Sequence, residues 1–305
     1  MVTTPVPPRA ALVLPRLAPG TFPFCSRWPF LSSGVRMHHV DEGQGPAVVM
    51  VHGNPSWSFL YRQAIPALAK NYRVIVPDHL GCGLSDMPPP GYGFTLAERV
   101  ADLAELLDSV VPHGPVDLVA HDWGGMIALA WAIDHPERVR RLVLMNTAGF
   151  GLPPGAAIPM SLRLARTPLV GSWLVRGLNL FVKGAIRHGV TKPLPPAAAQ
   201  GFLAPYGTWE ERAAIHRFVL DIPLGKGHPS WDLVQRVAGA LPSLMDKPLL
   251  LLWGLRDFVF TPPFLDQWRR VWPKAQAHVL PEAGHWLLED EPDECVRRVE
   301  AFLQP

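Results

Sequence analysis

Polar side chains that could do chemistry follow four apolar runs of this sequence, at the point where each run ends. The four groups are His52–Trp57, His121–Gly125, Gly254–Asp257 and Ala283–His285. A short apolar run bounded by turn residues is typical of a buried strand. Because functional groups of an open parallel sheet gather beyond the carboxyl ends of its strands, we expect these groups to converge at one edge.

The second group predicts a sharp turn from strand to helix that presents a single side chain above the sheet. Such a turn needs small neighbours, and Ala120, Gly124 and Gly125 provide them around Asp122. No serine lies in a Gly-x-Ser-x-Gly setting, so the presented residue is Asp122. A carboxylate can displace a leaving group from a saturated carbon and so become an alkyl ester.

Hydrolysis of that ester requires a base that activates water, and His285 is placed for this role. Asp257 would hold the imidazole in the required tautomer and stabilise its protonated form. The order along the chain is then nucleophile, acid, base.

Each of these residues also has an ordinary structural explanation. Asp122 could cap the helix that follows it, Asp257 could cap a helix near Thr261, and His285 could be a simple loop histidine. The catalytic interpretation depends on the ordered set of four strand ends and not on any one member.

Strand-like and helix-like patterns alternate along the chain, which predicts an α/β fold with a mostly parallel sheet. The expected strands are 47–51, 72–77, 116–120, 142–145, 249–253 and 277–280. The expected helices are near 58–70, 96–111, 124–134, 262–271 and 290–303.

Residues 151–228 interrupt this alternation, because they contain short helical stretches separated by Pro and Gly and no strand-like run. We expect a helical cap, or lid, over a core formed by residues 1–150 and 229–305. Within it, the stretch Leu162–Arg187 carries five basic residues among apolar ones. A solvated lid face is the expected explanation, and a patch for a membrane, a partner or a fatty substrate is the alternative.

Composition excludes several classes of protein. The net charge of +2 argues against a nucleic-acid partner, and no apolar run is long enough to span a membrane. Three distant cysteines exclude a disulfide framework and indicate a reducing, cytoplasmic location. The Pro-rich first 20 residues predict an extended arm, not a signal peptide.

From about residue 35 onward the motifs resemble the haloalkane dehalogenases, a family of the α/β-hydrolase superfamily. The residues that carry the resemblance are His52–Pro55, Pro77–Ser85, His121–Gly125, Gly254–Asp257 and Gly284–His285. The resemblance implies that Asn54 and Trp123 bind the leaving anion through N–H donors. Their ordinary explanations are a turn residue and simple packing. Some dehalogenases carry the triad acid where this chain has Asn146, so Asp257 is the expected acid.

Neighbouring families that share the Asp motif fit less well. Epoxide hydrolases need two lid tyrosines, whereas only Tyr206 falls in the predicted lid. Fluoroacetate dehalogenases carry Arg where this chain has Trp123. The lid stretches 204–209 and 217–224 look like a dehalogenase subgroup that includes the β-lactone decarboxylases of olefin biosynthesis. That subgroup keeps the same five residues and releases an alkene and carbon dioxide.

The sequence thus predicts an enzyme that attacks an alkyl carbon of an apolar small molecule, with hydrolytic dehalogenation by water placed before β-lactone decarboxylation. A non-catalytic binding protein of the same fold is the remaining alternative. No metal or organic cofactor is implied, because side chains supply the nucleophile, base and anion donors. Partner enzymes would be expected if the reaction belongs to olefin biosynthesis.

Overall fold

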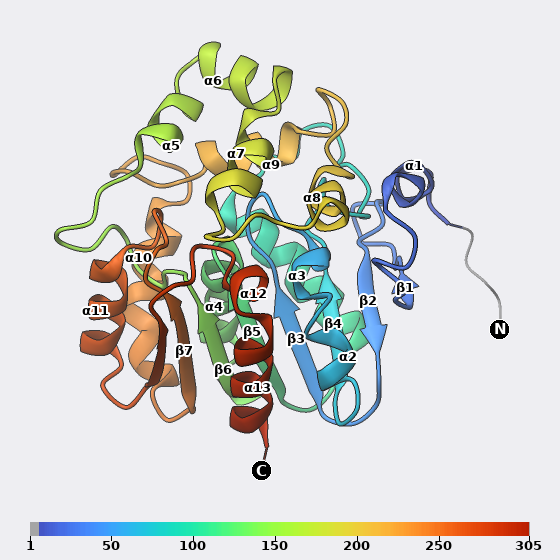
Figure 1. Cartoon of the computed structure of the whole chain (residues 1–305). Coiled ribbons are helices and arrows are strands. Elements are labelled where there is room, and N and C mark those ends of the chain that lie inside the picture. Colours follow the sequence, from blue (N-terminus) through green and yellow to red (C-terminus); the bar gives the residue numbers. More distant parts are fainter. Residues whose placement is uncertain (1–5, 305) are drawn as a thin grey trace.

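One mixed sheet organises the chain in the computed structural model, which describes residues 6–304 (Figure 1). Its strand order is β1-β2-β4-β3-β5-β6-β7-β8. The bounds are β1 (Ser26–Arg27), β2 (His39–Glu42), β3 (Ala47–Val51), β4 (Arg73–Pro77), β5 (Val116–His121), β6 (Val139–Met145), β7 (Leu249–Gly254) and β8 (Gln276–Leu280). The pairs β1–β2 and β2–β4 are antiparallel, and every other pair is parallel.

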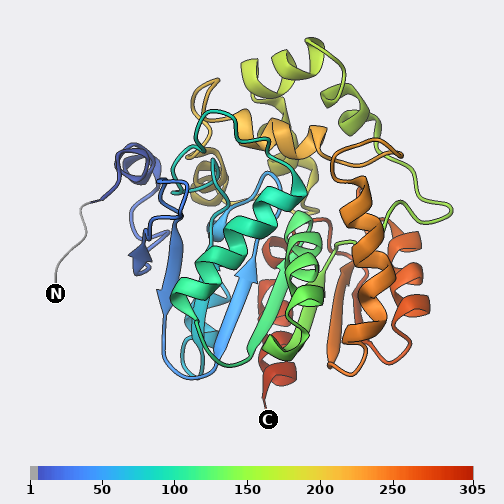
Figure 2. The same cartoon turned by 180° about the vertical axis from the view of Figure 1, so that it is seen from behind.

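Helices cover both faces of this sheet, as the two opposite views show (Figures 1 and 2). One face carries α2 (Ile65–Leu68), α12 (Leu287–Asp290) and α13 (Pro292–Leu303). The other carries α3 (Leu96–Val110), α4 (Trp123–Asp134), α10 (Trp231–Ala240) and α11 (Pro262–Val271). Short helical turns connect these elements: η2 (Ser58–Tyr61), η3 (Pro136–Arg138) and η5 (Leu241–Leu244).

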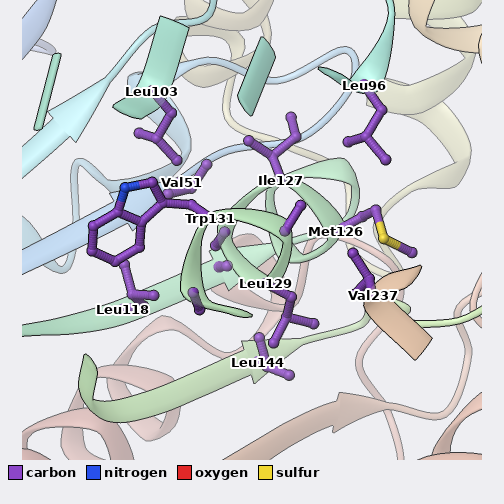
Figure 3. Close-up of a cluster of buried hydrophobic side chains, with 14 of the residues drawn as sticks. Val51, Leu96, Leu103, Leu118, Met126, Ile127, Leu129, Trp131, Leu144 and Val237 are labelled. Carbon is purple, nitrogen blue, oxygen red and sulfur yellow. The ribbon is translucent and has the colours of Figure 1, made fainter. Parts of the chain in front are cut away.

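Alternate residues of the central strands pack into two separate cores, because successive side chains of a strand point to opposite faces. On β5, Leu118 packs with α3 and α4, whereas Val119 packs with α2 and α13. Figure 3 shows the first core, where Leu129 and Trp131 of α4 lie against strand residues such as Leu118 and Leu144. Helix α4 is therefore buried along most of its length, which fixes the strand-to-helix turn before it.

The predicted fold class is confirmed, and the six predicted strands correspond to β3–β8. Strands β1 and β2 were not predicted, because they are short and mostly polar; β1 is the edge strand, and β2 lies between β1 and β4. The helix expected over 58–70 is divided into η2 and α2, since Pro66 lacks the N–H that a continuous helix needs there. Helix α10 was also missed.

The N-terminal arm is not wholly extended, which corrects the expectation from its prolines. Residues 1–5 lie outside the described residues, but α1 (Pro8–Val13) and η1 (Leu14–Arg16) are helical. Pro8 stands at the start of α1, where its missing N–H costs no helical hydrogen bond. Arg9 ties the arm to the core by donating to the carbonyls of Gly81, Gly83 and Pro205.

Between β6 and α10 the chain leaves the sheet, and the described residues of this segment form helices without a strand. We call residues 151–228 the insertion. It contains α5 (Met160–Ala165), α6 (Val170–Ser172), η4 (Trp173–Gly177), α7 (Leu180–His188), α8 (Pro196–Leu203) and α9 (Ala213–Leu220). Figure 1 shows it beyond one end of the sheet, with α5 and α6 farthest from the strands. No described helix is both long and apolar enough to cross a membrane.

The packing of α4 predicts a large stability cost for Leu129→Ala. Leu129 is fully buried, so the change removes apolar contacts and leaves a cavity. We expect a loss of about 2–5 kcal/mol in the free energy of unfolding, measured by urea denaturation. Leu12→Ala in α1 is the matched control, because Leu12 is 60% exposed. Equal effects of the two changes would contradict this account of the core.

Candidate active site

Asp122 occupies a strained turn between β5 and α4, at the middle of the sheet. Its φ of 52° and ψ of −129° lie where side-chain-bearing residues rarely fall. Neighbouring backbone must approach closely to hold this turn. A Cβ at Gly124 would collide with the Val51 carbonyl, and a Cβ at Gly53 would collide with the Asp122 side chain. Gly124, one of the small residues that indicated the turn in the sequence, is thus required by the packing, and Gly53 is a further requirement that the sequence analysis did not identify.

Backbone donors hold one oxygen of the Asp122 carboxylate. The N–H of Asn54 donates to Oδ2 at 2.6 Å, and the N–H of Trp123 also contributes. Burial raises the pKa of Asp122 to about 6, although the nearby His285 and these two N–H groups oppose that rise.

His285 and Asp257 form a buried pair beside Asp122. The Nδ1 of His285 lies 2.8 Å from Oδ2 of Asp257. Burial disfavours the charged form of both, but their mutual attraction outweighs it. The pKa of Asp257 is therefore lowered and that of His285 is raised. Such a pair keeps Asp257 ionised and leaves Nε2 of His285 available for a proton.

Asn146 holds Asp257 in place, a role that the sequence analysis missed. Its Nδ2 donates to Oδ2 of Asp257 at 2.7 Å, and its Oδ1 accepts from the N–H of Gly254 at 2.8 Å. Asn146 follows β6 directly, so its position at a strand end was the available signal. Asn146 was considered only as a possible triad acid, and its capacity to donate a hydrogen bond was overlooked.

The side chains of Asn54 and Trp123 lie at the same pocket, but their settings differ. Asn54 Nδ2 donates to the Ile215 carbonyl of α9 at 3.0 Å, which leaves one N–H of the amide for a ligand. The Trp123 ring packs on Phe218 of α9, with 5.6 Å between ring centroids. Its indole N–H has no hydrogen-bond acceptor among the described residues. Two neutral donors are thus available to a developing anion.

An apolar pocket opens above these groups and encloses about 990 Å³, counting the part open to solvent. Asp122, His285, Asn54 and Trp123 line its inner part, and the rest of its lining is almost entirely hydrophobic. The insertion contributes residues such as Leu162, Phe181 and Val219. The structure therefore brings the five predicted site residues together, with Asp257 behind His285.

Two other buried histidines near the pocket, His121 and His79, have structural roles. His121 is buried and its Nε2 lies 2.8 Å from the His285 carbonyl oxygen, so it steadies the backbone of that residue. Burial lowers the pKa of His121 to about 3, which keeps it neutral. His79 lies 3.0 Å from the His52 carbonyl and is likewise part of the support beneath the pocket.

Comparison with known proteins identifies the family of this chain. The family model of the alpha/beta hydrolase fold matches residues 46–292. A haloalkane dehalogenase 2 from Mycobacterium tuberculosis is 37% identical, over 90% of this chain and 93% of that protein. The chain belongs to the α/β-hydrolases, in the branch of the haloalkane dehalogenases.

Two decarboxylases are more similar in sequence to this α/β-hydrolase than that dehalogenase is. Cis-3-alkyl-4-alkyloxetan-2-one decarboxylases from Shewanella oneidensis and Xanthomonas campestris are 46% and 43% identical. They match 90% and 89% of this chain and 87% and 93% of their own length. A haloalkane dehalogenase structure from Bradyrhizobium elkani superposes with a TM-score of 0.82 at 25% identity, over 92% of this chain and 97% of the other. The relatives are enzymes, and this α/β-hydrolase is an enzyme.

The buried setting of Asp122 predicts that its carboxyl group gains a proton near pH 6, about two pH units above an ordinary aspartate. Infrared difference spectra of wild type against Asp122→Asn should show the protonated carboxyl band grow as the pH falls through about 6. A band that appears only near pH 4, the ordinary range for aspartate, would contradict this electrostatic account.

Proposed function

We propose that this enzyme opens a cis-3,4-dialkyl β-lactone (oxetan-2-one) and releases a cis alkene and carbon dioxide. The observation that carries the proposal is a buried carboxylate at the base of an apolar pocket in a chain 46% identical to an oxetanone decarboxylase. The sequence alone placed dehalogenation first. The order changes because the two decarboxylases are more similar to this chain than the dehalogenase is.

In the first step, Oδ1 of Asp122 attacks C4 of the lactone from the side opposite the ring oxygen. The C4–O bond breaks, and the ring oxygen becomes part of a carboxylate still attached to C3. Asn54 and the indole of Trp123 would bind this anion, since both donors lie at the same pocket. The product of the step is an alkyl ester of Asp122.

In the second step, the C2–C3 bond breaks and its electron pair forms the C3–C4 double bond. Carbon dioxide leaves, and the C4–O bond to Asp122 breaks to restore the carboxylate. The backbone N–H groups of Asn54 and Trp123 are placed to stabilise the charge that returns to Asp122. No water and no oxidant are consumed. Backside attack inverts C4 and places the ester oxygen anti to the carboxylate on C3. Anti elimination from this arrangement gives the cis alkene directly.

Dehalogenation is the second candidate, favoured by the two anion donors and by the 37% identical dehalogenase. Asp122 would form the same kind of ester and expel halide toward Asn54 and Trp123. The ester would then need water, which His285 would activate while Asp257 stabilises the imidazolium. The insertion would act as the lid in both reactions.

We further propose a cytoplasmic location, which is supported by the free thiols of Cys25, Cys82 and Cys295. A reaction of olefin biosynthesis would also bring partner enzymes that make the lactone. The site itself needs only an apolar small molecule for the lactone reaction, and water in addition for dehalogenation.

Incubation with synthetic cis-3,4-dialkyl β-lactones of increasing chain length tests the proposal. We expect a cis alkene and carbon dioxide, detected by gas chromatography with mass spectrometry. Asp122→Asn should lower the rate by at least about 10⁴-fold, because no nucleophile remains. Asp266→Asn on the exposed side of α11 is the matched control. A trans alkene would contradict the two-step route, and halide release from bromoalkanes without lactone turnover would favour the second candidate.

His285→Gln separates the two chemistries in one variant. With a bromoalkane, the ester should accumulate, because its hydrolysis needs the His285 base, and the protein mass should rise by one alkyl group. With a β-lactone, alkene release should continue, because that ester decomposes without water. Loss of alkene release with no added mass would show that His285 is needed before the ester forms and would contradict this division of roles.

A further inference from the structure

The outer part of the insertion has an unusual charge distribution. We call residues 160–187, which include α5, α6, η4 and most of α7, the insertion apex. The apex has no Asp or Glu, and the sequence has none anywhere from Arg138 to Trp209. It carries five basic residues, namely Arg163, Arg166, Arg176, Lys183 and Arg187.

These basic residues are not neutralised by the rest of the described chain. None of the five has an acidic partner in an ion pair among residues 6–304. Arg163, Lys183 and Arg187 are exposed, and Lys183 donates only to the Leu178 carbonyl. Arg166 and Arg176 also donate to backbone carbonyls. Arg163, Lys183 and Arg187 therefore present unpaired positive charge to the surroundings of the apex, whereas Asp221 acts on Arg166 and Glu210 acts on Arg176 from nearby.

The same surface exposes large apolar side chains. Seven of the fifteen exposed large hydrophobic residues of the described chain lie in the apex. They are Met160, Leu164, Leu169, Val170, Trp173, Leu178 and Leu180. Leu169 is 86% exposed and has a positive φ of 59°, a backbone conformation that is energetically unfavourable for leucine. Such a concentration of exposed apolar area usually marks an interaction surface.

The apex is also continuous with the mouth of the pocket. Leu152 and Leu224 both line the pocket and are more than half exposed, and Leu162 of α5 lines it from within the apex. In Figure 1, α5 and α6 form the end of the molecule farthest from the strands. A flat surface that meets this end would therefore meet the entrance to the pocket.

We propose that the insertion apex docks on an anionic phospholipid surface. Basic residues interleaved with Leu, Met and Trp are the composition of interfacial membrane-binding segments, where charge attracts the head groups and apolar side chains enter below them. A second copy of this chain is a poorer occupant, because a twofold contact would place two uncompensated basic faces against each other. Docking would let an apolar substrate pass between bilayer and pocket without crossing water. The inference stands on this surface and does not depend on which reaction Asp122 performs.

Flotation of the full chain with vesicles tests the proposal. We expect binding to phosphatidylcholine vesicles that contain phosphatidylglycerol, and weak binding to phosphatidylcholine alone. The double change Arg163→Glu with Lys183→Glu should weaken vesicle binding by at least about tenfold, because each basic residue near an anionic surface strengthens the affinity several-fold. Leu169→Ser with Trp173→Ser should weaken it by about tenfold through lost apolar insertion. Added salt should weaken binding of the wild type.

Matched controls carry the same changes elsewhere. Lys70 and Lys274 are exposed and lie just before β4 and β8, at the end of the sheet where these strands begin, opposite the insertion. The double change Lys70→Glu with Lys274→Glu should therefore leave vesicle binding unchanged. Phe30→Ser removes an apolar residue that is 67% exposed outside the apex and should also have no effect. Circular dichroism and turnover of a short, water-soluble substrate confirm that each variant is folded.

Several outcomes would overturn the proposal. The first is that the wild type does not bind anionic vesicles. The second is that the control variants lose as much vesicle binding as the apex variants. The third is that light scattering shows the apex variants dissociating an oligomer while their vesicle binding persists. Asp122→Asn should bind vesicles like the wild type, so failure of docking and failure of the proposed reaction are separable.

Discussion

The structure depends on keeping one carboxylate, that of Asp122, ionised in a pocket where burial favours its neutral form. Burial alone would protonate it, and the backbone N–H groups of Asn54 and Trp123 with the nearby His285 limit that effect. These donors reach the carboxylate only because the chain turns sharply between β5 and α4. The turn fits only because Gly124 leaves room for the Val51 carbonyl and Gly53 leaves room for the Asp122 side chain. The buried α4 and the central position of β5 then fix the turn from both sides. A poorly solvated carboxylate held in this way is a better nucleophile toward carbon than one in water.

The sequence predicted the central sheet and the site residues for the same physical reason. Strands buried on both faces appear as uninterrupted apolar runs, and polar residues directly after such runs are conspicuous. Strands β1 and β2 lack that signal, because they are short, most of their residues are polar, and several of these are not fully buried. Helix α1 was missed because prolines dominated the interpretation, although Pro8 is compatible with a helix start.

The role of Asn146 shows what a residue-type argument leaves out. A search for carboxylates discards an amide, yet the amide donates to Asp257 and accepts from Gly254, which no carboxylate could do. Hydrogen-bond partners far apart in the chain depend on which strands are neighbours, here β6 and β7. That information is available only once the sheet order is known.

Both proposed reactions would use one set of side chains, because the substrate would determine the fate of an ester formed on Asp122. An ester whose alkyl group has no neighbouring carboxylate cannot decompose by itself, so water and a base must hydrolyse it. An alkyl group with a carboxylate on the adjacent carbon can lose carbon dioxide and expel Asp122 by itself. Selection between them therefore falls to the shape and length of the apolar pocket and to how substrates reach it. The insertion contributes to both, because Leu162, Phe181 and Val219 line the pocket beside core residues such as Phe150 and Phe264.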